Sequence, residues 1–179
     1  MYSIYILLTR TNTILSRAIH RAPGNEYTHA ALSLDPTFTR LYSFGRKYRY
    51  SYLPAGFVLE SVDRGVLGAD ASTKCAVYEL IISEETYVEL CRVLEKMESE
   101  KGLYQYNILG LLLCLFGIEK ERRYHFFCSQ FISYVLEISG AAEPGKAPSL
   151  MRPVDFRQIP GVHQIFCGNI AQLRNTSFV

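Results

Sequence analysis

The sequence predicts an α+β fold in one domain that spans residues 1–179. Two observations support this class. Runs rich in aromatic and β-branched residues dominate the first half of the chain, and apolar residues at helical spacing dominate from Ser83 onward. A chain of 179 residues is long enough to bury a substantial core, and it contains no internal repeat, low-complexity block or linker. We therefore expect a small antiparallel sheet packed against helices.

The first half of the chain supplies most of the expected strands. Strands are predicted, in chain order, at residues 2–8, 28–35, 39–47, 57–62 and 74–83. The second and third of these form a hairpin, because Asp35-Pro36 supplies a turn between them. A short helix is predicted over residues 11–24, where Pro23-Gly24 ends the segment.

The second half supplies the helices. Ser83 caps the first, whose opening turn carries two glutamates and which ends before Gly102. Further helices are predicted over residues 106–117 and from Cys128 to Gly140, followed by a loop at 141–153 and a strand at 162–169.

Composition argues against several classes of protein. The formal net charge of +2 is too small to suggest a nucleic-acid binder. The five cysteines form no CxxC pair and no zinc-type spacing, so we expect no metal, no cofactor and no disulfide framework. Free thiols suit a reducing compartment, and the apolar run near the N-terminus lacks the basic flank and cleavage site of a signal peptide. A cytoplasmic location is the resulting expectation.

The run ILGLLLCLFGI at residues 108–118 is the most apolar part of the sequence. It is shorter than the ~20 residues that a membrane-spanning helix needs. We interpret it as a buried helix. Contact with a membrane is the alternative, and the basic KERR segment at residues 120–123 is its motivation.

Cys128 is the cysteine best placed for chemistry. It begins the helix FFCSQFISYVLEISG, where unpaired backbone N–H groups favour a thiolate and could stabilise an oxyanion. The other cysteines, at positions 75, 91, 114 and 167, fit the pattern of small core residues. Its position at the helix start does not by itself decide whether Cys128 is a nucleophile or a buried core residue.

His29 is the favoured base because it opens a strand that can face the helix of Cys128. His20, His125 and His163 have weaker positions: the end of a short helix, the approach to the Cys128 helix, and the C-terminal tail.

A third group should orient the imidazole ring of the base. Ser43 or Tyr42, on the partner strand of the hairpin, could reach the ring, and strand alternation allows only one of them on that face. We favour Ser43. Asp35 and Glu60 are the nearest carboxylates in sequence, but the sequence gives no geometric argument for either.

The segments YTHAALSLD, LYSFGR and FFCSQFISYVL, in this order, resemble the circularly permuted branch of the NlpC-type, papain-like cysteine peptidase superfamily. This branch includes the YiiX/YycO-like proteins and, more remotely, the lecithin retinol acyltransferase group. The histidine strand precedes the cysteine helix in this branch, as it does here, and the resemblance covers roughly residues 1–140. It implies a papain-like fold.

Residue by residue, the resemblance implies Cys128 as nucleophile and His29 as base. The third polar residue of the family lies on the strand after the histidine, often as a glutamate, and Ser43 occupies that position here. This departure brings full activity into question. Tyr27, Tyr104 and Asn107 are candidate substrate-binding residues on the basis of their position.

The function expected from these residues is a cysteine-dependent hydrolase of amidase, peptidase or thioesterase type. It would work through a Cys-His dyad and an acyl-enzyme, on an acyl, peptide or lipid substrate that the sequence does not identify. Two alternatives stay open: a non-catalytic binding module on the same fold, and a lipid-directed acyltransferase or phospholipase.

Overall fold

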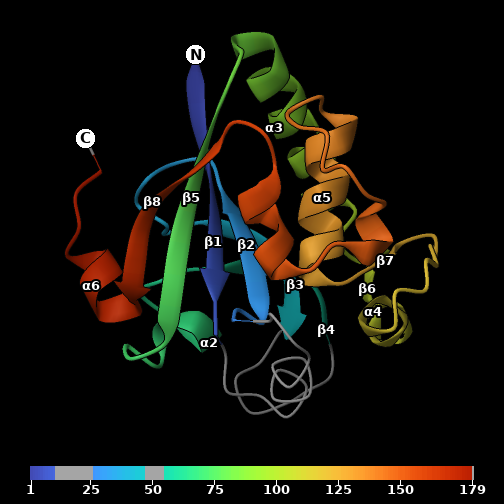
Figure 1. Ribbon diagram of the computed structural model, residues 1–179, viewed down its shortest axis with the longest axis horizontal. Helices are drawn as coiled ribbons and strands as arrows, with labels where there is room; N and C mark the ends of the chain where they lie inside the picture. The colour runs from blue at the N-terminus through green and yellow to red at the C-terminus, as the bar shows by residue number, and fades with distance from the viewer. Residues whose placement is uncertain (11–25, 47–54, 179) are drawn as a thin grey trace.

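The computed structural model describes residues 1–10, 26–46 and 55–178, and these form a single eight-stranded sheet with helices on both faces (Figure 1). The strands are β1 (Tyr2–Thr9), β2 (His29–Ser33), β3 (Leu41–Arg46), β4 (Ala55–Glu60), β5 (Lys74–Ile82), β6 (Gln105–Tyr106), β7 (His125–Phe126) and β8 (Val162–Asn169). The helices are α2 (Gly65–Gly68), α3 (Glu84–Ser99), α4 (Ile108–Leu115), α5 (Cys128–Ile138) and α6 (Ile170–Arg174), with 3₁₀ helices η1 (Pro148–Leu150) and η2 (Pro153–Gln158).

The sheet has the order β7-β6-β4-β3-β2-β1-β5-β8. All neighbouring strands are antiparallel except β6 and β7, which are parallel, so the sheet is mixed. The predicted α+β class is confirmed, but the sheet is larger than the small antiparallel one expected. The parallel pair was not predictable because β6 and β7 have two residues each, too few to show a strand period.

Most predicted elements lie where the sequence placed them. The strand predicted at 162–169 matches β8, and the helix predicted after Ser83 is α3, with the Ser83 hydroxyl accepting a hydrogen bond from the Thr86 N–H at 3.1 Å. The segment predicted as a loop at 141–153 contains η1. The helix predicted over residues 11–24 lies outside the described residues.

Alternation along the central strands gives the sheet two buried faces. On β1, Ile4, Ile6 and Leu8 belong to the core that the sheet shares with α3 and α5. Tyr5 and Leu7 point the other way and belong to a second core with α2 and α6. Helix α5 packs against β2 and β3 and lies beside α3 (Figure 1), so its first residue is held by a rigid platform.

Helix α4 lies at the β6–β7 end of the sheet (Figure 1). Only one of its sides is buried. Leu111 and Cys114 face inward, whereas Ile108, Leu109 and Leu112 are exposed. The expectation of a buried helix is therefore wrong for its outer side. The sequence could not show this, because a helix that is apolar all round has no polar stripe to mark its solvent face. In the described part of the chain, no helix is long and apolar enough to cross a membrane.

Asn107 fixes the start of α4 and ties it to α5. Its side-chain oxygen accepts from the Gly110 N–H at 2.9 Å, and its amide donates to the side-chain oxygen of Gln130 at 3.2 Å. A Cβ atom at Gly110 would overlap the amide of Asn107. Gly110 is therefore needed for the cap, although glycine costs helix stability elsewhere.

Substituting Gly110 with alanine should destabilise the protein by about 1–2 kcal/mol, because the new methyl group displaces the capping side chain. The matched control is Gly102→Ala, since a Cβ atom at Gly102 meets no other atom within 4 Å. Urea unfolding monitored by circular dichroism measures both variants. If Gly110→Ala were as stable as the unsubstituted protein, the cap would not depend on this glycine.

Candidate active site

His29 is the first residue of β2, and its ring is held by a carboxylate from β4. The ring Nε2 lies 2.6 Å from Oε2 of Glu60, and the two side chains are only 13% and 11% exposed. The pairing of Ser43 with Val58 and of Leu41 with Glu60 puts Glu60 on the same sheet face as Ser43. The structure thus places Glu60 beside the imidazole, a carboxylate for which the sequence alone offers no geometric argument.

Ser43 also reaches the ring, but as a more distant partner. Its hydroxyl oxygen lies 3.4 Å from Nε2 of His29 and donates its hydrogen to the carbonyl oxygen of Ala30 at 2.7 Å. Because that hydrogen is already used, Ser43 can only accept from the ring N–H. Glu60 is closer and negatively charged, so it is the stronger orienting group.

Cys128 is the first residue of α5, and its side chain is near enough to His29 to act on the pKa of the ring. Since Nε2 of His29 faces Glu60, Nδ1 is the ring nitrogen left for the thiol. No side chain caps the helix at Phe127, so the first-turn N–H groups near the sulfur are not occupied by a capping group. The carboxylate of Glu60, the imidazole of His29 and the thiol of Cys128 thus lie near one another, and such groups can supply an orienter, a base and a nucleophile.

The electrostatic environment favours the protonated form of His29. Burial by itself lowers the pKa of the ring, but the Glu60 carboxylate and the Cys128 thiol outweigh it and raise the pKa well above the ordinary value for histidine. A protonated His29 flanked by these two groups is the charge state that a thiolate–imidazolium pair requires.

Gly45, in β3, lies against the His29 ring and the Glu60 carboxylate. A Cβ atom at this position would lie 3.6 Å from Cε1 of His29 and 3.8 Å from Oε1 of Glu60. These are ordinary contact distances, so a methyl group fits there and a larger side chain would meet the ring.

A narrow pocket borders the thiol. It has a volume of about 10 Å³, roughly the room that one water molecule needs. Its walls are Thr28, Tyr106, Leu111, Cys114, Leu115, Cys128, Ser129, Met151, Arg152 and Pro153. Cys128 itself is only 4% exposed. Entry of an acyl substrate therefore requires movement of the α4 or η1–η2 wall.

Tyr106 is a pocket residue that the sequence did not single out. It is partly buried in β6, and burial, then the nearby Cys128 and Glu60, raise the pKa of its phenol well above the ordinary value. The hydroxyl thus stays neutral and can donate a hydrogen bond to a bound group. The sequence could have pointed to Tyr106 only through its position between the two candidates Tyr104 and Asn107.

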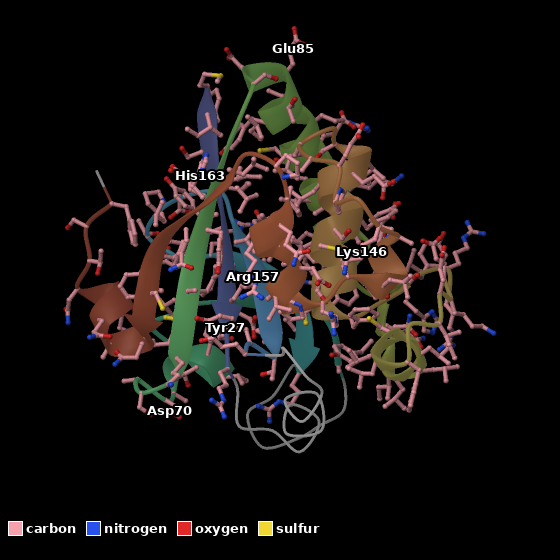
Figure 2. The ribbon with its side chains drawn as sticks, viewed as in Figure 1. Tyr27, Asp70, Glu85, Lys146, Arg157 and His163 are labelled. Atoms are coloured by element: carbon pink, nitrogen blue, oxygen red, sulfur yellow. The ribbon has the colours of Figure 1, made fainter. Side chains whose placement is uncertain are left out.

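None of the three predicted substrate-binding residues lines this pocket. Tyr104 packs against Phe44, and Asn107 is fully buried as the α4 cap. Tyr27 is buried over the sheet, with its hydroxyl 3.9 Å from the sulfur of Cys167 (Figure 2).

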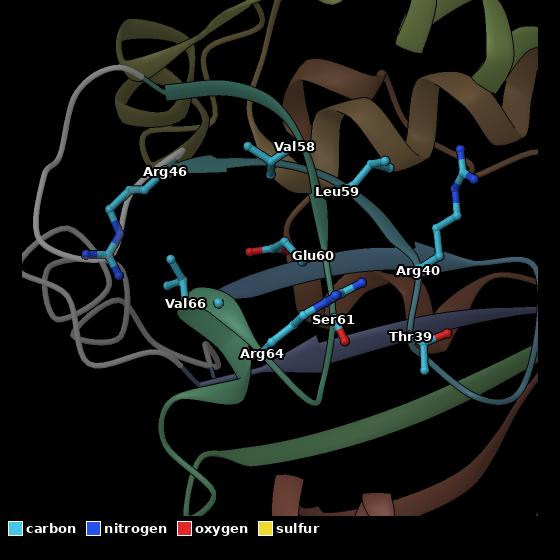
Figure 3. A pocket seen from close by; sticks show the side chains of 10 residues that line it. Thr39, Arg40, Arg46, Val58, Leu59, Glu60, Ser61, Arg64 and Val66 are labelled. Atoms are coloured by element: carbon cyan, nitrogen blue, oxygen red, sulfur yellow. The ribbon is translucent and has the colours of Figure 1, made fainter.

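A larger groove opens on the other side of Glu60. Its volume is about 990 Å³, and Arg40, Arg46 and Arg64 are among the residues that line it (Figure 3). Arg40 is bound to Glu98 at 2.7 Å. Cys128 lines the narrow pocket and not this groove, whereas Glu60 lines the groove and His29 lines neither.

The ring of His125 is held by its neighbours in sequence. Both of its ring nitrogens are engaged, Nδ1 with the Arg123 carbonyl at 2.7 Å and Nε2 with Arg122 at 3.2 Å, so this ring has other partners than the thiol. Within residues 1–10, 26–46 and 55–178, no group of three or more His, Cys, Asp or Glu side chains could hold a metal ion. His20 lies outside these residues.

Comparison of the chain with protein families, with curated proteins and with solved structures found no match in any of the three. The chemistry of the site therefore has to be inferred from its own geometry.

Proposed function

We propose that this protein is a cysteine-dependent hydrolase, of amidase, peptidase or thioesterase type, in which Cys128 is the nucleophile, His29 the base and Glu60 the orienting carboxylate. The observation that carries this proposal is the 2.6 Å contact between Glu60 and Nε2 of the buried His29 ring, with the Cys128 side chain near enough to raise the pKa of the same ring. Ordinary core packing of a cysteine gives no reason for a buried imidazole and carboxylate to be aligned behind it.

The reaction proceeds in two steps. In the thiolate–imidazolium pair the proton of the Cys128 thiol already lies on His29, so the sulfur attacks the substrate carbonyl carbon, and the bond to the leaving group breaks as that group receives the proton from His29. His29 then removes a proton from water, which attacks the thioester. The carbon–sulfur bond breaks, the acid product leaves, and the proton that His29 took from water restores the thiolate–imidazolium pair with Cys128.

The start of α5 can stabilise the negative oxygen that forms in both steps. The N–H groups of its first turn lie next to the sulfur, and no capping side chain occupies them. Such donors act in a site from which water is largely excluded, where they are worth more than in bulk solvent.

The chain order favours a permuted papain-like fold for this hydrolase. The histidine strand β2 precedes the cysteine helix α5, as in the NlpC-type branch that the sequence resembles. A glutamate often serves as the third residue of that branch, and Glu60 supplies one here from β4. The proposal thus places the carboxylate one strand further along the sheet than the position of Ser43.

A non-catalytic binding module is the second candidate. The 4% exposure of Cys128 and the small volume of its pocket favour it, because they leave no open route for a substrate in this conformation.

Incubation with small acetyl thioesters, esters and amides separates the two candidates. A hydrolase forms an acetyl adduct on the peptide that contains Cys128 and releases product with turnover, as mass spectrometry and product analysis would show. Adducts on other cysteines only, or no adduct with any of the three bond types, would contradict the proposed reaction.

A further inference from the structure

We propose that the outer face of α4 docks onto the surface of a lipid bilayer with anionic headgroups. This α4 face consists of Ile108, Leu109, Leu112, Phe116 and Ile118, whose exposed fractions range from 42% to 80%. All five lie on α4 or the turn that follows it, at one corner of the molecule (Figure 1).

The concentration of apolar surface here is unusual. In the described part of the chain, twelve large hydrophobic residues are exposed, and five of them belong to this short stretch. Leu109, Leu112 and Phe116 follow at spacings of three and four residues, so they lie along one stripe of the helix. Contiguous apolar surface of this kind is a feature of interaction sites, whereas single exposed residues need no explanation.

Charge next to the face favours a lipid surface as the occupant. The segment after Ile118 exposes three cations, Lys120, Arg122 and Arg123, against two carboxylates. The guanidinium of Arg123 lies over the ring of Tyr124, 4.7 Å from its centre. An apolar helix face with basic and aromatic residues at its border matches the interface of an anionic bilayer.

The size of the face argues against a second copy of the chain. A stable interface between two proteins takes roughly 20–30 residues from each side. The α4 face offers five apolar residues on a helix of eight residues and its following turn. A bilayer imposes no such requirement, since even one short helix can insert its apolar side chains among lipid tails.

The opposite side of the same helix borders the candidate active site. Leu111, Cys114 and Leu115 form a wall of the pocket beside Cys128, and Asn107 ties the helix start to Gln130 on α5. Docking of α4 would therefore bring the thiol close to the bilayer, where an apolar acyl substrate could enter as the α4 wall moves. This last step rests on the proposed hydrolase function, whereas the docking itself does not.

Co-sedimentation with vesicles tests the docking. The unsubstituted protein should bind vesicles of phosphatidylcholine mixed with phosphatidylserine. The affinity of the double variant Leu109→Glu, Phe116→Glu for the same vesicles should be lower by roughly tenfold or more. Val88→Glu is the control, because Val88 is an exposed apolar residue on α3 and its replacement adds one carboxylate away from the face. Lys120→Gln should lower binding to the anionic vesicles by roughly fivefold.

Three results would overturn the docking proposal. The first is an unsubstituted protein that does not bind vesicles, and the second is an equal loss of binding in Val88→Glu and in the double variant. The third is a dimer, detected by light scattering, that the double variant converts to a monomer without any vesicle binding. Circular dichroism confirms that each variant is folded.

The Cys128→Ala variant separates docking from catalysis. It should bind vesicles as well as the unsubstituted protein, because Cys128 is not part of the α4 face. Normal vesicle binding with no acyl adduct on the unsubstituted protein would reject the hydrolase and keep the docking. An acyl adduct on Cys128 without vesicle binding would reject the docking and keep the hydrolase.

Discussion

Replacing Cys128 with alanine is expected to abolish acylation of the protein by small thioesters and esters. The variant keeps the fold, since alanine is a small apolar residue at a position that is 4% exposed. It lacks the only atom that can form the thioester in the proposed mechanism, so turnover should fall by roughly 10³-fold or more. Mass spectrometry of the intact protein measures the loss directly.

The control for this experiment is Cys167→Ala. Cys167 is the exposed cysteine of the chain, on β8, and would react first if exposure alone determined labelling. We expect this variant to acylate and turn over like the unsubstituted protein. Equal acylation of Cys128→Ala and the unsubstituted protein would show that Cys128 is not the nucleophile.

Replacing Glu60 with glutamine is expected to slow acylation of Cys128 by roughly 10²–10⁴-fold. The amide keeps the shape of the side chain but removes the negative charge that lies 2.6 Å from Nε2 of His29. It can also present an N–H to the ring, which would favour the wrong tautomer of the base. The rate of acyl-adduct formation at the peptide containing Cys128 provides the measurement.

Ser43→Ala tests which of the two partners orients His29. We expect a smaller loss of rate than in Glu60→Gln, because the Ser43 hydroxyl is 3.4 Å from Nε2 and already donates to Ala30. A larger loss in Ser43→Ala than in Glu60→Gln would assign the orienting role to the serine, as the sequence alone had favoured.

The pairing of Cys128 with His29 could be inferred before the structure because both signals are local. A cysteine at a helix start and a histidine at a strand start are visible in a few residues each. The structure places the two side chains near one another, and their catalytic roles stay predictions.

The role of Glu60 could not be inferred in the same way. Its approach to His29 depends on the register between β3 and β4, and on the position of β3 next to β2. A strand pattern gives the face of each side chain but not which strand lies next to it, nor how the two are aligned. From the sequence, Glu60 could be identified as a nearby carboxylate but not as the partner of His29.

The exposure of α4 was hidden for a different reason. Burial of a helix is read from the contrast between its apolar and polar sides, and residues 108–118 contain no charged residue that would mark a solvent side. Only the placement of α4 at the end of the sheet shows that Leu109 and Phe116 face outward.

The titration of His29 tests the central claim, the alignment of Cys128, His29 and Glu60, most directly. The chain has four histidines, so the imidazole signal of His29 in an NMR spectrum is assigned by its loss in His29→Gln. In the folded protein the ring should stay protonated well above pH ~6.5, the ordinary midpoint for histidine. Its stabilising contribution is then complete below pH ~6.5 and is lost as the pH rises through the raised pKa. Glu60→Gln should lower this pKa. A His29 that titrates at or below pH ~6.5, or whose pKa does not change in Glu60→Gln, would contradict the proposed site.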